Sequence, residues 1–171
     1  MNNTKRIVLL SVLAALAICL SFFDKQISTI AFPNLPQAKI GLANIVILLA
    51  IYKFSFKESL ILVLLKATIG NLLIGGFTAI IIGGSASLIS FFGMYFLFKF
   101  LKNQLSGVGI SVVGGFLHII TQLFVIGLLY IYIGEILLYY GAVLVLLSLI
   151  TSIIIGLIMN KLITYEFTKA F

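Results

Sequence analysis

Long apolar runs separated by short polar breaks make up almost the whole chain. Runs of about 17 to 25 residues match the roughly 30 Å hydrocarbon core of a bilayer when they form helices. The pattern predicts six membrane-spanning helices: 7–23, 38–54, 59–75, a fourth that ends near 101, 107–130 and a sixth that ends at Lys161. Two glycine pairs, Gly75–Gly76 and Gly83–Gly84, bracket residues 77–82, which are predicted to form a turn or a re-entrant element. Because the helices fill the chain, we expect one transmembrane domain over residues 1–171.

The first apolar run follows Lys5 and Arg6, an arrangement that a secretory signal peptide shares. The run ends at Phe23 and Asp24, with no small-x-small cleavage site. We therefore predict an uncleaved first helix.

Composition supports an all-α integral membrane protein. Hydrophobic residues form 63% of the 171 residues and charged residues only 9%, too few to cover a soluble domain with polar surface. The net charge of +7 is interpreted as a signal of orientation, so no nucleic-acid partner is expected. The single cysteine, Cys19, excludes a disulfide framework.

The cations predict the orientation. Only Lys25 and Lys39 lie on one predicted side, whereas eight cations lie on the other: Lys5, Arg6, Lys53, Lys57, Lys99, Lys102, Lys161 and Lys169. Since positive residues concentrate in cytoplasmic loops, both termini are predicted to be cytoplasmic.

Residues 34–46, NLPQAKIGLANIV, are the least hydrocarbon-like stretch, and the other elements are interpreted around them. Pro33 and Pro36 precede Lys39 and Asn44. A helix N-terminus with free N–H groups beside a lysine suits an anionic or polar solute. The alternative is an extracellular loop that only caps the second span.

Polar residues also occur inside the predicted spans. Lys66 lies near the middle of the third span, where a lysine costs several kcal/mol unless it has a partner or a wet cavity. It is a functional-site candidate, and the alternatives are a bond to a carbonyl group or snorkelling. In the fifth span, His118 and Gln122 are one helical turn apart and share a face, which lines either a packed interface or a cavity.

One shared pocket would satisfy all these groups together. We predict a substrate-binding site made by Lys39, Asn44, Lys66, Asn71, His118 and Gln122. Donors outnumber acceptors in this set, so the solute should be anionic or rich in acceptors.

Small residues follow one face of the first helix. Ser11, Ala15 and Cys19 recur at four-residue spacing, with Ala14 and Ala17 beside them. Such a face lets another helix approach closely. We predict partner docking at Ser11, Ala14 and Ala15, and packing within the chain is the alternative.

Motifs for chemistry are missing from the sequence. No glycine-rich loop ends in Lys-Ser/Thr, so the chain cannot hydrolyse ATP by that means. Four acidic residues without an aspartate cluster disfavour a magnesium-dependent prenyl-transfer site. We expect no enzymatic activity, no metal and no other cofactor.

Three stretches resemble a known membrane family: residues 36–46 (PQAKIGLANIV), 107–111 (GVGIS) and 118–123 (HIITQL). The family is catalogued both as heptaprenyl diphosphate synthase component I and as Gx transporter, and it is similar to the S components of energy-coupling factor transporters. Two positions depart from the family pattern: Lys66 stands where an arginine is expected, and Ile119 follows His118 where asparagine is usual.

The resemblance implies an S-component-like subunit in the bacterial cytoplasmic membrane. It would capture a small, vitamin- or precursor-like solute from outside and depend on a separate transmembrane coupling protein and ATPase module. The alternative is a non-catalytic accessory subunit of isoprenoid or quinone biosynthesis.

Overall fold

The computed structural model describes residues 3–31, 33, 39, 41–101, 104–130 and 134–169, and these include no strand. The helical elements are α1 (Asn3–Ala31), α2 (Asn44–Lys53), α3 (Phe56–Leu65), η1 (Lys66–Gly70), α4 (Asn71–Ala79), η2 (Ile80–Gly84), α5 (Ser85–Leu101), α6 (Gly107–Leu129) and α7 (Gly134–Lys169). The two η elements are π-helical turns inside longer helices.

Within the residues that the structure describes, four helical stretches are long and apolar enough to cross a membrane: Thr4–Ala31, Phe56–Leu101, Gly107–Leu129 and Tyr139–Tyr165. Their surfaces expose many large apolar side chains, such as Phe77 and Leu73, which are each 73% exposed. A soluble protein would bury this apolar area, and lipid covers it without cost. The chain is therefore an all-helical membrane protein. The six-span count and the sidedness stay predictions.

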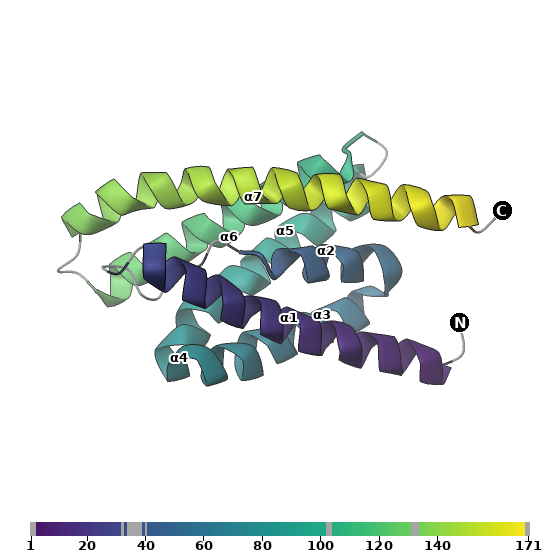
Figure 1. Ribbon diagram of the computed structural model, residues 1–171, viewed down its shortest axis with the longest axis horizontal. Coiled ribbons are helices and arrows are strands. Elements are labelled where there is room, and N and C mark those ends of the chain that lie inside the picture. The colour runs from purple at the N-terminus through teal and green to yellow at the C-terminus, as the bar shows by residue number, and fades with distance from the viewer. Residues whose placement is uncertain are drawn as a thin grey trace.

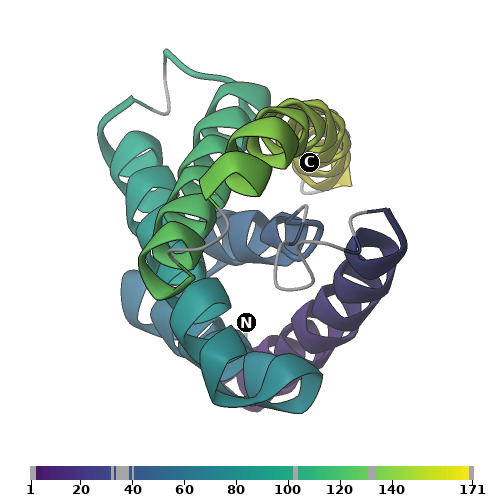
Figure 2. The same ribbon diagram turned by 90° about the vertical axis from the view of Figure 1, so that its left-hand side faces the viewer.

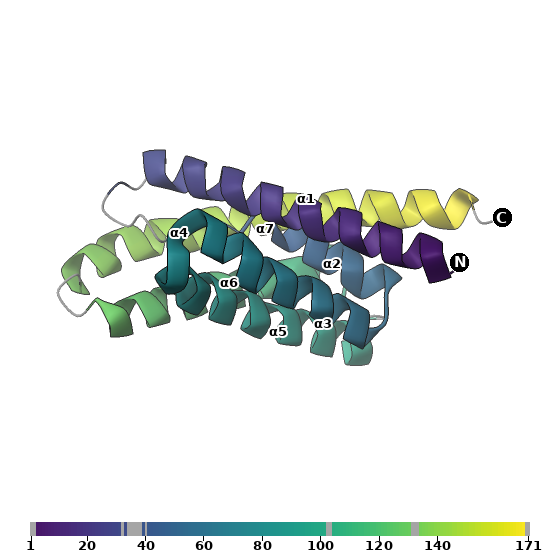
Figure 3. The ribbon, with the colours of Figure 1, turned by 90° about the horizontal axis from the view of Figure 1, so that it is seen from below.

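The stretch Phe56–Leu101 is two helical arms joined at Gly75 and Gly76. Their backbones are non-helical, and Gly76 has φ 67° and ψ −154°, a conformation that only glycine adopts readily. The arms lie side by side in opposite directions, with α4 at the turn (Figure 3). The glycine pair was correctly predicted to interrupt the helix. Residues 77–82 are helical and continue into α5, so the predicted turn at these residues is wrong, and a re-entrant element stays a prediction.

Two predicted span boundaries are also wrong. The first helix continues past Asp24 to Ala31, because the protein itself satisfies the Asp24 carboxylate. The second helix begins at Asn44 rather than near 38. Before it, the backbone N–H groups of Gly41 and Leu42 donate to a side chain instead of to helical carbonyls. Irregular backbone of this kind is tolerated at membrane depth only where protein surrounds it.

The short helix α2 lies at the centre of the molecule, between α1 on one side and the other helices on the other (Figure 2). Ile47, Leu48 and Ala50 are completely buried there. They belong to the main apolar core, which also includes Leu62 and Phe91. A central α2 places the loop before it inside the bundle.

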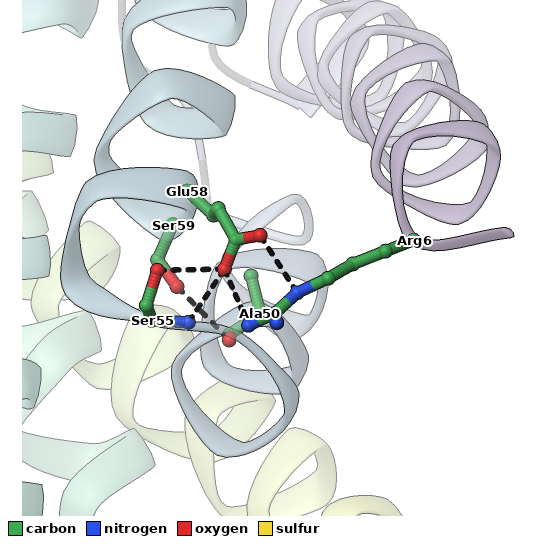
Figure 4. Close-up of polar contacts among 5 residues, drawn as sticks. All are labelled: Arg6, Ala50, Ser55, Glu58 and Ser59. Atoms are coloured by element: carbon green, nitrogen blue, oxygen red, sulfur yellow. Dashed lines mark hydrogen bonds and ion pairs between the residues drawn. The ribbon is translucent and has the colours of Figure 1, made fainter. Parts of the chain in front are cut away.

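Both termini lie at the same end of the bundle (Figure 1). At that end an ion pair joins α1 to the start of α3: Arg6 Nε lies 2.7 Å from Glu58 Oε1 (Figure 4). The other oxygen of Glu58 accepts the Ser55 N–H at 2.9 Å, which caps α3. A cleft of about 360 Å³ lies beside the pair, between α1 and α3. The polar cluster described next lies about eighteen residues further along α1, at the other end of the bundle.

Candidate functional site

A single carboxylate holds the loop that precedes α2. Asp24, on α1, is 1% exposed, and its Oδ2 accepts the backbone N–H groups of Gly41 at 2.7 Å and Leu42 at 3.1 Å. Gly41 has φ +100°, a left-handed conformation that strains any residue with a side chain. The loop therefore turns into the bundle at Gly41 with its amides directed at α1.

Lys39 links this loop to two other elements. Its backbone N–H donates to Gln122 Oε1 on α6 at 3.0 Å, and its ammonium Nζ donates to Asn71 Oδ1 at 2.6 Å. The side chain is 5% exposed. Burial lowers the pKa of the Lys39 ammonium to about 8, and the negative charge of Asp24 acts in the opposite direction. Three of the predicted site residues are thus joined by hydrogen bonds.

The π-helical turn η1 orients Lys66 and Asn71. Positions five residues apart lie about 140° from each other around an α-helix. In a π-turn, which closes i to i+5 bonds, the same spacing brings the two residues close to one face. The second π-turn, η2, packs against η1. There Gly83 leaves room for Asn71, since a Cβ on Gly83 would lie 2.7 Å from Asn71 Oδ1.

Lys66 is buried deep in the bundle, with 4% of its surface exposed. Its Nζ donates to Ser87 Oγ at 2.8 Å, and this hydroxyl donates in turn to the Gly83 carbonyl at 2.6 Å. An ammonium has three donors. Among the residues that the structure describes, Lys66 and Lys39 each have one acceptor, so both ammonium groups have donors to spare.

Asn44 and His118 converge on Gly41 from α2 and α6. A Cβ on Gly41 would lie 3.2 Å from Asn44 Nδ2 and 3.6 Å from His118 Cδ2. The two side chains are 4% and 2% exposed. Within the described part of the chain, neither the amide of Asn44 nor Nδ1 of His118 has a hydrogen-bond partner. Such buried unpaired groups are rare and costly, and they require an explanation.

All six predicted site residues are buried. Five of them belong to the loop before α2, contact it or bond to it, and Lys66 bonds to Ser87 beside them. Sequence reasoning missed Ser87, which accepts from Lys66, and Asp24, which accepts from the loop amides of Gly41 and Leu42. It also missed Ser28, whose buried hydroxyl has no partner among the described residues and which lies one turn beyond Asp24. The signal for Asp24 was available, because it is the only acidic residue in the sequence before Glu58.

The expected free N–H groups at the start of the second helix are not free. The amides of Asn44, Ile45 and Val46 donate to the carbonyls of the turn before them, at 2.9 to 3.3 Å. These three amides are therefore not available to an anion, and the candidate donors are side chains. Among the described residues, no three His, Cys, Asp or Glu side chains gather as a metal site would require.

The small-residue face of α1 is divided between two environments. Ser11, Ala15 and Cys19 are exposed on the isolated chain, whereas Ala14 and Ala17 are buried in the core. The three predicted docking residues therefore do not share one surface: Ser11 and Ala15 are accessible, and Ala14 packs inside.

Fold and cluster define the class of the protein: a multi-helix membrane protein with a dense polar cluster inside one end of its bundle. The family model described as heptaprenyl diphosphate synthase component I matches residues 13–162, and the chain belongs to this family. No curated protein and no solved structure matches the chain. The family description names a component of a synthase, which leaves the role of the polar cluster to be argued from its residues.

Proposed function

We propose that this chain is the solute-capturing subunit of an importer, similar to an S component of an energy-coupling factor transporter. It binds a small, anionic, vitamin- or precursor-like solute from outside. A separate transmembrane coupling protein and an ATPase module then drive its transport.

One observation carries the proposal: unpaired polar atoms of Asn44 and His118 lie in the same buried cluster as two lysines. A buried lysine and a buried unpaired amide each cost free energy in a bilayer. Polar groups with a purely structural role have their hydrogen-bond partners within the protein. In a binding site, some donors and acceptors stay unpaired until the ligand binds. Among the described residues, the cluster holds two lysines, Lys39 and Lys66, and the carboxylate of Asp24, which gives it an excess of positive charge for an anion.

The position of the cluster supports entry from the outside. Gly41 and Leu42 are bonded to Asp24, which lies on the part of α1 that is distant from both termini (Figure 1). With the predicted cytoplasmic termini and six crossings, that part faces the exterior. The loop then acts as a lid whose opening, by release of the Asp24 bonds, exposes the cluster.

The accessible part of the α1 small-residue face supports a protein partner. Ser11 and Ala15 are exposed where a neighbouring helix can approach the α1 backbone closely. Energy for transport must come from such a partner, since the chain has no phosphate-binding loop of the Walker type.

The family description favours a second candidate function, a non-catalytic accessory subunit of heptaprenyl diphosphate synthesis with no transport role. The buried lysines would then hold structure or contact a diphosphate group. This alternative gives no role to the unpaired Asn44 carbonyl oxygen, because a diphosphate offers acceptors and few donors.

Uptake measurements separate the two functions. Small molecules released from the denatured, purified chain are identified by mass spectrometry, and their uptake is measured in cells with and without a co-expressed coupling protein and ATPase module. We expect a released acidic solute whose uptake requires both the chain and the module. Release of an isoprenoid diphosphate, with no module-dependent uptake, would support the accessory role instead.

A further inference from the structure

The unpaired atoms at Gly41 specify more than charge. Asn44 contributes a donor, its Nδ2 amino group, and an acceptor, its Oδ1. If the side-chain amide of Asn44 is flipped, so that Oδ1 and Nδ2 exchange places, the residue still offers one unpaired donor group and one unpaired acceptor, because neither atom has a partner in the described structure. Asn44 is thus prepared for a ligand that presents an acceptor and a donor side by side.

His118 adds a second acceptor. The Ala86 backbone acts on the ring as a hydrogen-bond acceptor would, while Nδ1 is unpartnered among the described residues. We therefore assign the ring hydrogen to Nε2. In the neutral ring with this tautomer, Nδ1 carries a lone pair and accepts.

A simple anion leaves this part of the cluster unsatisfied. Phosphate, diphosphate or a plain carboxylate accepts from the Asn44 amino group and from the lysines, but it brings no donor for Asn44 Oδ1 or His118 Nδ1. Both acceptors are at least 96% buried, and an acceptor left unpaired after binding loses affinity. The best ligand must therefore also donate.

We propose, resting on the proposed function, that the solute presents a neutral edge with N–H donors next to a carbonyl or ring-nitrogen acceptor. An amide, a lactam or an amino-substituted nitrogen heterocycle has such an edge. The edge pairs with Asn44 and His118, and an acidic group of the same molecule faces Lys39 and Lys66. An ammonium donor fits poorly, because the two lysines already give this cluster positive charge.

Matched probe molecules test the neutral hydrogen-bonding edge of the solute separately from its acidic group. Orotate has a carboxylate and a heterocyclic edge with N–H and C=O groups, and 1,3-dimethylorotate keeps the carboxylate while methyl groups replace both N–H donors. Affinities of the purified full chain in lipid nanodiscs are measured for both by titration calorimetry, with inorganic diphosphate as the acceptor-only probe. We expect wild type to bind orotate at least tenfold more tightly than either other probe.

Variants assign the preference to its residues. Asn44→Leu and, independently, His118→Phe should each reduce the ratio of orotate to dimethylorotate affinity to below threefold. Asn160→Leu makes the same substitution near the other end of the bundle, where Asn160 accepts the Gly107 N–H, and should leave the ratio unchanged. Measuring two site variants keeps the test valid if one of them does not fold.

Equal affinity of wild type for orotate and dimethylorotate would contradict the proposal that the solute donates hydrogen bonds to Asn44 and His118. It would not contradict the proposal that the chain captures an anion. A preference for diphosphate, or a ratio that persists in both site variants, would contradict the first of these proposals as well. Binding of none of the three probes also counts against the edge. Capture itself is tested independently by the compounds released from the purified chain.

Discussion

At the scale of single residues, the cluster combines groups that are costly to bury. Lys39 donates hydrogen bonds from its backbone N–H to Gln122 and from its ammonium group to Asn71, so both its backbone and its side chain are held in place. Its lowered pKa reports that burial disfavours the charged form more than Asp24 favours it. An anionic solute would restore this balance, so solute binding and protonation of Lys39 are linked.

This linkage predicts how affinity depends on pH. Binding of an anion raises the pKa of Lys39 above its solute-free value of about 8. The contribution of Lys39 to affinity is therefore complete below pH 8 and is lost as the pH rises above it, by about tenfold per unit until the bound-state pKa is reached. Titration of the solute that co-purifies with the chain, from pH 6.5 to 9.5, measures this.

Lys39→Arg is the control, since arginine stays charged throughout this range. Its affinity should change much less above pH 8 than that of wild type. The same fall in both proteins would assign the pH dependence to another group, such as Lys66 in the same cluster or Lys25 on α1.

The six candidate site residues could be proposed from the sequence because lysines, amides and a histidine are conspicuous in apolar runs. Their geometry could not. Lys66 and Asn71 share a face only through a π-turn, and no periodicity in an apolar segment announces one. Asp24 was taken for the end of a helix, because its partners are backbone amides seventeen and eighteen residues away and have no signature in the sequence.

At the scale of elements, the Asp24 carboxylate joins α1 to the loop before α2. Hydrogen bonds to a charged group contribute about 1.5 to 3 kcal/mol. Asp24→Asn should therefore open the loop more often and raise hydrogen exchange of the Gly41 and Leu42 amides by roughly ten- to a hundredfold. Exchange measured by mass spectrometry on the purified chain gives this ratio.

Arg6→Gln provides the matched comparison, because it weakens the ion pair to Glu58 at the other end of α1. That change should leave exchange in the loop as it is in wild type. If Asp24→Asn exchanges at the wild-type rate too, the carboxylate does not hold the loop.

The division of the α1 small-residue face gives a second prediction at this scale. Ala15→Leu adds bulk on the exposed side and should abolish pull-down of the ATPase-linked coupling protein, while thermal stability and solute binding remain. Ala14→Leu adds the same bulk inside the core and should destabilise the chain by about 1 to 3 kcal/mol.

If Ala15→Leu does not fold, the exposed face packs inside the chain instead of binding a partner. If the folded Ala15→Leu protein still binds the coupling protein, the face contacts lipid. Sequence spacing alone could not separate these neighbours. Ala14 and Ala15 differ by one position, and only the packing of α1 against α2 and α3 decides which of them faces the core.

At the scale of the whole molecule, alternation of polar and apolar segments predicted an all-helical membrane protein, and the fold confirms it. The second span was predicted too long, because a buried loop and a short helix together resemble one apolar run. The reversal at Gly75–Gly76 was predictable, since a glycine pair interrupts an otherwise unbroken pattern.

Topology gives a direct prediction. In a Cys19→Ser background, Lys57→Cys lies at the end that carries both termini, and Pro33→Cys lies beyond α1 at the other end. With cytoplasmic termini, an impermeant thiol reagent should label only Pro33→Cys in intact cells, and both positions after lysis. Labelling of Lys57→Cys in intact cells would reverse the orientation.

The central claim is that the buried polar cluster holds the solute, and the affinity of purified Lys66→Met tests it most directly. The solute that co-purifies with wild type should bind Lys66→Met more weakly by about 1.5 to 3 kcal/mol, the contribution of a hydrogen bond to a charged group. Lys57→Met, which removes an exposed cation, should bind like wild type. Equal affinities of wild type and Lys66→Met, with the variant merely less stable, would assign Lys66 to structure and contradict the site.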